Sequence, residues 1–301
     1  MKRKKLTLLI GNDINNINNS NSWETLLRKI IAYLGVTNQV NAANLRAKPF
    51  PLLYEEIFLK ALTKKEQSEV KLKEFIASLT NEIRHNSIHE RIMKLKLADI
   101  MTTNYEYSLQ NASAKTKDSK NLRYVNERMY SIFRHNRVGE TRVWHIHGEC
   151  DSPRSITLGY EHYGGLLQHM RNYVATGTDY TKEKNLIPLI KRIERNKLNG
   201  HSWIDLFFTN DVHILGLSLD TSEIDLWWLL TYRARYVLQK GRGIVTNRIY
   251  YYYPTRYKEK SKDKLELLEA NQVTPIEIKK GDDKTKYYNA ILDKIANDRG
   301  L

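Results

Sequence analysis

Short apolar runs alternate along this chain with longer stretches in which apolar residues recur every three or four positions. The short runs are typical of buried strands, and the longer stretches are typical of amphipathic helices. Strands that alternate with helices favour a sheet of mostly parallel strands with helices on both faces. The pattern therefore predicts an α/β, Rossmann-like fold. The runs that predict strands lie at residues 6–10, 98–102, 130–134, 143–146, 156–158, 212–215, 248–253 and 274–278.

Two long stretches carry helical patterns with little strand signal. Apolar residues follow helical spacing throughout residues 51–93, and a second helical region has its clearest apolar stripe at 186–193. An earlier helix is expected to begin at Trp23, after a polar loop whose Ser22 can cap it. We expect one domain over residues 1–301, with helical insertions at about 37–95 and 160–205 and a basic C-terminal extension at about 255–301.

Composition narrows the class of protein. The formal net charge is +15 and the isoelectric point is about 9.6. A positive surface favours nucleic acid, nucleotides or an acidic partner, although many lysines can also simply keep a protein soluble. Cys150 is the one cysteine, which excludes a disulfide framework and a Cys-rich zinc site, so no metal is expected.

The apolar runs are short. None reaches the roughly 18 residues of a membrane-spanning helix. The run at 6–10 follows a basic start but is too short for the apolar core of a signal peptide. We therefore expect a cytoplasmic protein that does not enter a membrane.

Two predicted strands end in polar side chains that are common in active sites. Asn104 follows the strand at 98–102, and His147 follows the strand at 143–146. In an open α/β sheet, ligands bind outside the carboxyl ends of the strands. An Asn and a His delivered to that edge from two strands predict a reaction centre.

A third strand, at 212–215, ends in Gly216, and Ser218 follows before the next predicted helix. A glycine lets a ligand approach the backbone, while the Ser hydroxyl and the first helix amides can hold a ribose or a phosphate. An ordinary turn between a strand and a helix has the same pattern, so these two residues alone leave both interpretations open.

The order of these motifs resembles the sirtuin-like family, in its bacterial antiphage branch. The resemblance covers roughly residues 6–230, and its most specific part is the ordered pair of blocks around Asn104 and His147. The matching segments are the Gly11 turn with Ser22-Trp23-Glu24-Thr25-Leu26-Leu27, then Thr102-Thr103-Asn104-Tyr105-Glu106, His145-Ile146-His147-Gly148, residues 156–163, and Leu215-Gly216-Leu217-Ser218-Leu219.

Two departures from the family pattern bear on the activity. The opening turn, Gly11-Asn12-Asp13-Ile14-Asn15, has fewer glycines than is usual, and this variant also resembles the abortive-infection AbiH family, which keeps a His-x-His-Gly block. The zinc-ribbon cysteines of the protein deacylases are absent. The resemblance therefore implies hydrolysis of NAD+ rather than deacetylation.

The resemblance also implies roles for individual residues. Asn104 would orient the attacking water or a ribose hydroxyl, and His147 would take the proton from that water. A buried His147 with a purely structural role is the alternative. The residues expected to bind NAD+ are Gly11, Asn12 and Asp13 near the pyrophosphate, Ser218 at the adenosine-side ribose, and Thr103, Tyr105, Gly216 and Leu219 around them.

These expectations define two candidate functions. The first is an NAD+ hydrolase that cleaves the nicotinamide–ribose bond as the effector of a bacterial antiphage or abortive-infection system. Such an activity would harm its own host, so we expect control by homo-oligomerisation or by a separate sensor subunit. The second is a basic nucleic-acid- or nucleotide-binding module without catalysis, with the tyrosines at 250–253 as its most suggestive stacking patch.

Overall fold

The computed structural model describes residues 5–299 apart from 18–20, 42–44, 46, 64–66, 114–120, 123–126, 128, 182–183, 199, 241–242 and 280–282. Its main sheet contains β1 (Leu6–Ile10), β2 (Asp99–Thr102), β3 (Asn121–Leu122), β4 (His135–Val138), β5 (Thr141–His145), β8 (Asp211–Leu215), β9 (Ile249–Pro254) and β10 (Val273–Ile278). The strand order is β10-β9-β8-β1-β2-β5-β4-β3. Strands β10 to β5 run parallel in that order, and β4 and β3 add an antiparallel edge.

The chain reverses the direction in which it adds strands at β1. Strands β2 and β5 lie on one side of β1, whereas β8, β9 and β10 lie on the other. Backbone hydrogen bonds hold the neighbouring strand ends together, because the N–H of Gly11 donates to Leu215 and the N–H of Thr103 donates to Ile10. The crevice outside the carboxyl ends of strands at such a switch point is where open α/β sheets bind ligands.

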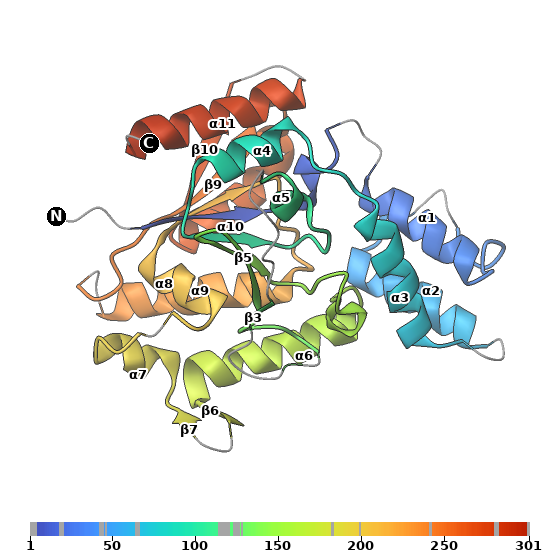
Figure 1. Cartoon of the computed structure of the whole chain (residues 1–301), viewed down its shortest axis with the longest axis horizontal. Helices are drawn as coiled ribbons and strands as arrows, with labels where there is room; N and C mark the ends of the chain where they lie inside the picture. Colours follow the sequence, from blue (N-terminus) through green and yellow to red (C-terminus); the bar gives the residue numbers. More distant parts are fainter. Residues whose placement is uncertain are drawn as a thin grey trace.

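Helices cover both faces of the sheet (Figure 1). On one face lie α4 (Ser87–Lys94) and α11 (Lys284–Arg299), and on the other lie α6 (Tyr160–Arg171), α8 (Trp203–Thr209) and α9 (Ile224–Lys240). The predicted α/β, Rossmann-like architecture is thus confirmed. The remaining helices of the described chain include α5 (Ser108–Asn111), α7 (Leu189–Glu194) and α10 (Lys262–Ala270).

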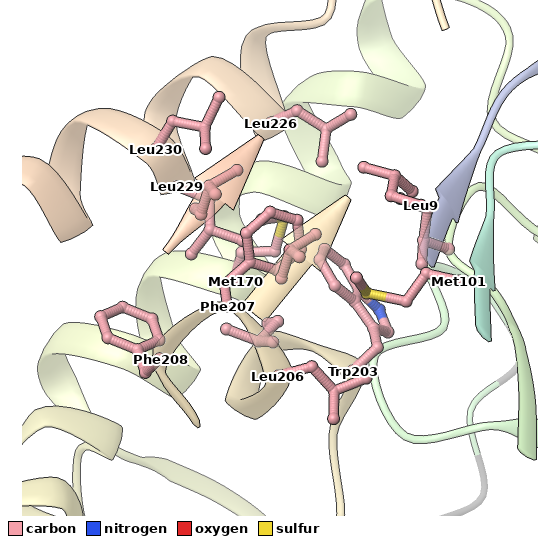
Figure 2. Close-up of a cluster of buried hydrophobic side chains, with 14 of the residues drawn as sticks. Leu9, Met101, Met170, Trp203, Leu206, Phe207, Phe208, Leu226, Leu229 and Leu230 are labelled. Atoms are coloured by element: carbon pink, nitrogen blue, oxygen red, sulfur yellow. The ribbon is translucent and has the colours of Figure 1, made fainter. Parts of the chain in front are cut away.

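The alternation of side chains along the central strands builds two cores. Leu8 and Ile10 of β1 belong to the cluster beneath α4 and α11, whereas Leu9 belongs to the cluster beneath α8 and α9. Figure 2 shows the second cluster, in which Leu9 and Met101 lie with Trp203 of α8 and other apolar side chains of α8 and α9. Because both faces are buried, these strands are apolar at nearly every position.

Helices α1 (Trp23–Tyr33), α2 (Phe50–Leu62) and α3 (Glu69–Asn81) lie together beside the sheet (Figure 1), and we call them the helical module. Ser22 caps α1 as predicted, since its hydroxyl accepts a hydrogen bond from the N–H of Thr25. The module has its own apolar core, which also contains Tyr105, Ile156 and Leu158. Those three residues come from the segments that follow β2 and β5, so the module packs directly against the chain that carries the candidate site.

Residues 160–205 and 255–301 also contain strands. The first region includes an irregular helical turn at Asn172–Thr176 and a hairpin of β6 (Thr178–Thr181) and β7 (Lys184–Leu186), in addition to α6, α7 and the start of α8. The basic C-terminal region contributes the edge strand β10, which pairs with β9, and the helix α11.

Two of the predicted strands are wrong. Residues 130–134 are bent and irregular, because the buried Glu127 carboxylate accepts hydrogen bonds from the backbone of Ile132 and Phe133, and the strand begins only at His135. Residues 156–158 are extended but join no sheet, since the N–H of Thr157 donates to the His147 carbonyl and its own carbonyl accepts from Tyr105. In both cases contacts with distant groups replace the ladder of a neighbouring strand.

Candidate functional site

A pocket of about 240 Å³ opens at the switch point of the sheet. Residues that follow four central strands line it, and they are Asn12 and Asp13 after β1, Thr103 after β2, His147 after β5, and Gly216 and Ser218 after β8. Trp23 and Phe50 of the helical module form the opposite wall. The cavity therefore lies between the sheet and the module, with polar groups on the sheet side and aromatic rings facing them.

The turns after β1 and β8 touch each other at two glycines. The N–H of Asp13 donates to the carbonyl of Gly216 at 3.0 Å. A Cβ on Gly11 would lie 2.4 Å from that same carbonyl oxygen and 2.5 Å from the Cα of Leu217, both of them backbone atoms. Gly216 itself has φ +68°, a left-handed conformation that glycine adopts without strain. Both glycines are thus needed to bring the two strand ends together.

His147 forms a buried pair with a carboxylate from α9. Its Nε2 lies 2.9 Å from Oδ2 of Asp225, and the two side chains are 3% and 0% exposed. The ring also packs edge-on against Tyr163 of α6, with the ring centroids 5.3 Å apart. Gly148, with φ +97°, turns the chain immediately after His147. The ring is therefore held from three directions.

This pairing fixes what the imidazole can do. A carboxylate only accepts hydrogen bonds, so Nε2 must carry the proton, and the neutral ring then has its acceptor lone pair on Nδ1. Among the described residues no hydrogen-bond partner of Nδ1 is present. His147 also lines the pocket, so the arrangement suits a general base whose protonated form is stabilised by Asp225.

Asn104 lines a smaller pocket beside the main one. Its carbonyl accepts a hydrogen bond from a ring nitrogen of His145 at 2.7 Å, and its N–H donates to the Thr102 hydroxyl. The Oδ1 atom of its side chain is buried without a partner among the described residues. Asn104 and Tyr105 line a smaller pocket that shares Asn12 and Trp23 with the main one, whereas His147 lines only the main pocket.

Glu106 lies at the base of that smaller pocket. Asn15 donates to its Oε1 at 2.8 Å. Burial raises the pKa of the Glu106 carboxyl, although hydrogen bonds from Asn15, Asn104 and Ser108 oppose the shift. The smaller pocket thus combines apolar walls with an unsatisfied amide oxygen and an acid that favours its neutral form.

A second large pocket, of about 340 Å³, adjoins the main one across Asp13, Gly216 and Ser218. Its far wall comes from β9, α10 and α11. The ammonium of Lys264 lies 5.6 Å from the ring centre of Tyr251 and donates to the Ser218 carbonyl at 2.8 Å. The two pockets together form a path that follows the strand ends from His147 to β9, with an aromatic ring and a cation at its far end.

The predicted residues are distributed along this path. Asn12, Asp13, Thr103, His147, Gly216 and Ser218 line the main pocket, and Gly11 lies under it as a backbone contact. Asn104 and Tyr105 line the smaller pocket, and Leu219 is fully buried in the core beneath α9. Of the tyrosines at 250–253, Tyr251, Tyr252 and Tyr253 are largely buried and line the second pocket.

The sequence prediction did not include Asp225, Glu223 or Tyr163, which all border the main pocket or its histidine. Asp225 lies 78 residues from His147 and stands in the first turn of a helix, where an acidic residue is expected for helix stability alone. The one usable signal was the number of carboxylates between residues 220 and 225, directly after the Ser218 turn.

These features define an α/β protein with a pocket and a buried His–Asp pair at the switch point of its sheet. The family model of the SIR2-like domain matches residues 98–276, well over half of the chain, and the chain belongs to this family. Members of the family are in general NAD-dependent enzymes, so the function is related to NAD+. Comparison with curated proteins found no match.

The residues that the structure describes show neither a metal-binding cluster nor a membrane-spanning helix. They contain no group of three or more His, Cys, Asp or Glu side chains arranged to hold a metal ion. Across the same residues, none of the helices is both long and apolar enough to cross a bilayer.

Proposed function

We propose that this protein is an NAD+ glycohydrolase, which cleaves the nicotinamide–ribose bond and releases nicotinamide and ADP-ribose. The observation that carries the proposal is the buried His147–Asp225 pair, whose histidine lines a pocket at the switch point of a SIR2-like domain. The single-cysteine composition excludes a Cys-rich zinc site of the kind that supports peptide binding in deacylases, which favours water as the acceptor.

The chemistry requires few groups. The pyridinium of NAD+ is already a good leaving group, and its departure builds positive charge on the ribose. Nδ1 of His147 would take a proton from the attacking water, and the Asp225 carboxylate would stabilise the imidazolium that forms. Asn104 would orient the water or a ribose hydroxyl through its unsatisfied Oδ1.

The two adjoining pockets provide room for the rest of the dinucleotide. The pyrophosphate would lie over the Gly11–Gly216 contact, where Lys284 balances the charge of Asp13 by donating to it at 2.8 Å. The adenosine would occupy the second pocket beside Tyr251 and Lys264, with Ser218 at its ribose. Thr103, Tyr105 and Gly216 would bound the nicotinamide half.

The test follows NAD+ loss and nicotinamide release by liquid chromatography. The His147→Ala variant should lose the activity. Because it also leaves the buried Asp225 carboxylate without its partner, its melting temperature is measured on the same samples. His85→Ala is the matched control, because His85 pairs with Glu90 on the surface of α4 and is far more exposed than His147. Full activity in the His147 variant would exclude this histidine as the base.

We further propose that the enzyme is the effector of a bacterial antiphage system, acts in the cytoplasm and is activated by assembly with itself or with an acidic sensor subunit. The support is the resemblance to the antiphage branch together with the net charge of +15. NAD+ turnover and light scattering should rise together when the chain assembles. Assembly through charge should weaken as salt approaches 1 M, where screening acts within about 3 Å. A monomer that is fully active alone would refute this control.

A further inference from the structure

Glu223 lies in the wall of the same pocket as His147. It is the residue before α9, and it stands two positions before Asp225. Its N–H donates to the carbonyl of Asp220, which fixes the turn into the helix. Its Oε2 atom is buried and has no hydrogen-bond partner among the described residues. The pocket wall thus contains a carboxyl group with one oxygen that no described residue satisfies.

The surroundings of Glu223 favour its uncharged form. Burial raises the pKa of this carboxyl well above its usual range, and the nearby carboxylates of Asp225 and Asp220 raise it further. The ammonium of Lys264 on α10 and a backbone hydrogen bond from Asp220 act against the shift. The phenols of Tyr105, Tyr163 and Tyr251, from three other segments, also interact with it electrostatically.

Glu223 and Asp225 therefore have different tasks although they are close neighbours. Asp225 is held by the imidazole of His147, while Glu223 has no cation of comparable proximity. Two neighbouring carboxyl groups with different partners commonly divide the work of one active site.

We propose that Glu223 is a further substrate-contacting residue, which binds the nicotinamide-side ribose of NAD+ and opposes the positive charge on that ribose. This inference rests on the proposed function. NAD+ brings a pyridinium cation into the pocket, and a nearby cation favours the charged form of a carboxyl group. The O–H bond of Glu223 then breaks and its proton leaves to solvent. The resulting anion stabilises the ribose cation as the C–N bond breaks and its electron pair goes to nicotinamide.

The test is calorimetric titration with carba-NAD+, an uncleavable analogue that keeps the pyridinium charge and the ribose hydroxyls. Titration in buffers of different ionisation enthalpy measures the protons released on binding. The wild-type chain should release protons on binding, and its affinity should rise with pH because binding favours the deprotonated form. NADH, whose dihydronicotinamide ring is neutral, should release none.

The Glu223→Gln variant keeps the shape of the side chain and removes its ionisation. It should bind carba-NAD+ without proton release, and its kcat for NAD+ should fall at least tenfold with little change in KM. Glu266→Gln, an exposed position on α10, is the matched control and should behave as wild type. If Glu223 only stabilised the start of helix α9, the Glu223→Gln variant would have a changed melting temperature but would release protons as the wild type does.

The outcomes separate the two proposals. Proton release that persists in Glu223→Gln, or no binding of carba-NAD+ to the wild-type chain, overturns the role of Glu223. Proton release that depends on Glu223, in a chain that never consumes NAD+, supports the contact and overturns the hydrolase.

Discussion

Replacing Asp225 with Asn tests the catalytic pair most directly. The amide has the shape of the carboxylate but no charge, and it can present an N–H to Nε2 of His147 in place of the oxygen that now lies 2.9 Å away. That exchange would move the ring proton to Nδ1, the nitrogen that does not contact residue 225. The histidine would then offer a donor where the reaction needs an acceptor.

Two effects set the expected magnitude. Loss of a charge-assisted hydrogen bond to the imidazolium costs about 1.5–3 kcal/mol, or roughly 10- to 150-fold in rate. Reversal of the tautomer can raise the loss to about 10⁴-fold, as in other His–Asp pairs. We therefore expect kcat to fall by about 10²–10⁴-fold. KM should change little, because Asp225 is 0% exposed and does not reach the substrate.

The assay is initial-rate NAD+ consumption, with the melting temperature measured on the same samples. Asp263→Asn, an exposed position on α10, is the control for loss of one negative charge. Asp225→Glu should recover part of the rate, since it restores the carboxylate acceptor, although the longer side chain displaces that carboxylate from its present position. An Asp225→Asn variant that keeps more than half of the wild-type kcat would refute the role assigned to the pair.

Three further outcomes follow from the structure. Gly11→Ala should destabilise the fold by about 1–3 kcal/mol and weaken NAD+ binding, because its Cβ would lie 2.4 Å from the Gly216 carbonyl oxygen. Gly164→Ala is the control, since the space around its Cβ is open, and it should change neither the melting temperature nor NAD+ binding. Urea titrations should show the free energy of unfolding falling from pH 7 towards pH 4. Burial lowers the pKa of His89 and of His213 to about 4, whereas the same histidines in the unfolded chain take up protons below about pH 6.5. The difference costs about 3 kcal/mol of stability per residue. His213→Gln should reduce that slope, and an unchanged slope would exclude this origin for His213. Chelators should leave NAD+ cleavage unchanged, whereas loss of activity that zinc or manganese restores would contradict the metal-free mechanism.

The parts of this site that were visible in the sequence are those that follow directly from a strand. Thr103, His147 and Gly216 each stand within two residues of an apolar run, and parallel strands bring their carboxyl ends to one edge of the sheet. Position along the sheet could therefore be inferred without knowing any contact. The confirmed strands are also those in which apolar residues face helices on both sides.

Contacts between distant segments could not be inferred in this way. The pairing of Asp225 with His147 depends on where α9 crosses the sheet. An acidic residue in the first turn of a helix is also expected simply because it stabilises the helix, so Asp225 did not stand out in the sequence. The error at 130–134 has a similar origin, because Glu127 satisfies the backbone of Ile132 and Phe133 that would otherwise pair with a strand. Local patterns carry no information about which side chain will reach such a segment.

The shared core of the helical module makes the module part of the machinery around the pocket. Tyr105 and Ile156 pack among the apolar side chains of α1, α2 and α3. Tyr105 directly follows Asn104, and Ile156 precedes Thr157, whose N–H donates to the His147 carbonyl. Packed interiors are barely compressible, so a force on the outer surface of the module displaces these two residues with it. A partner that binds the outer surface of α2 or α3 can therefore change the distance between Asn104 and His147.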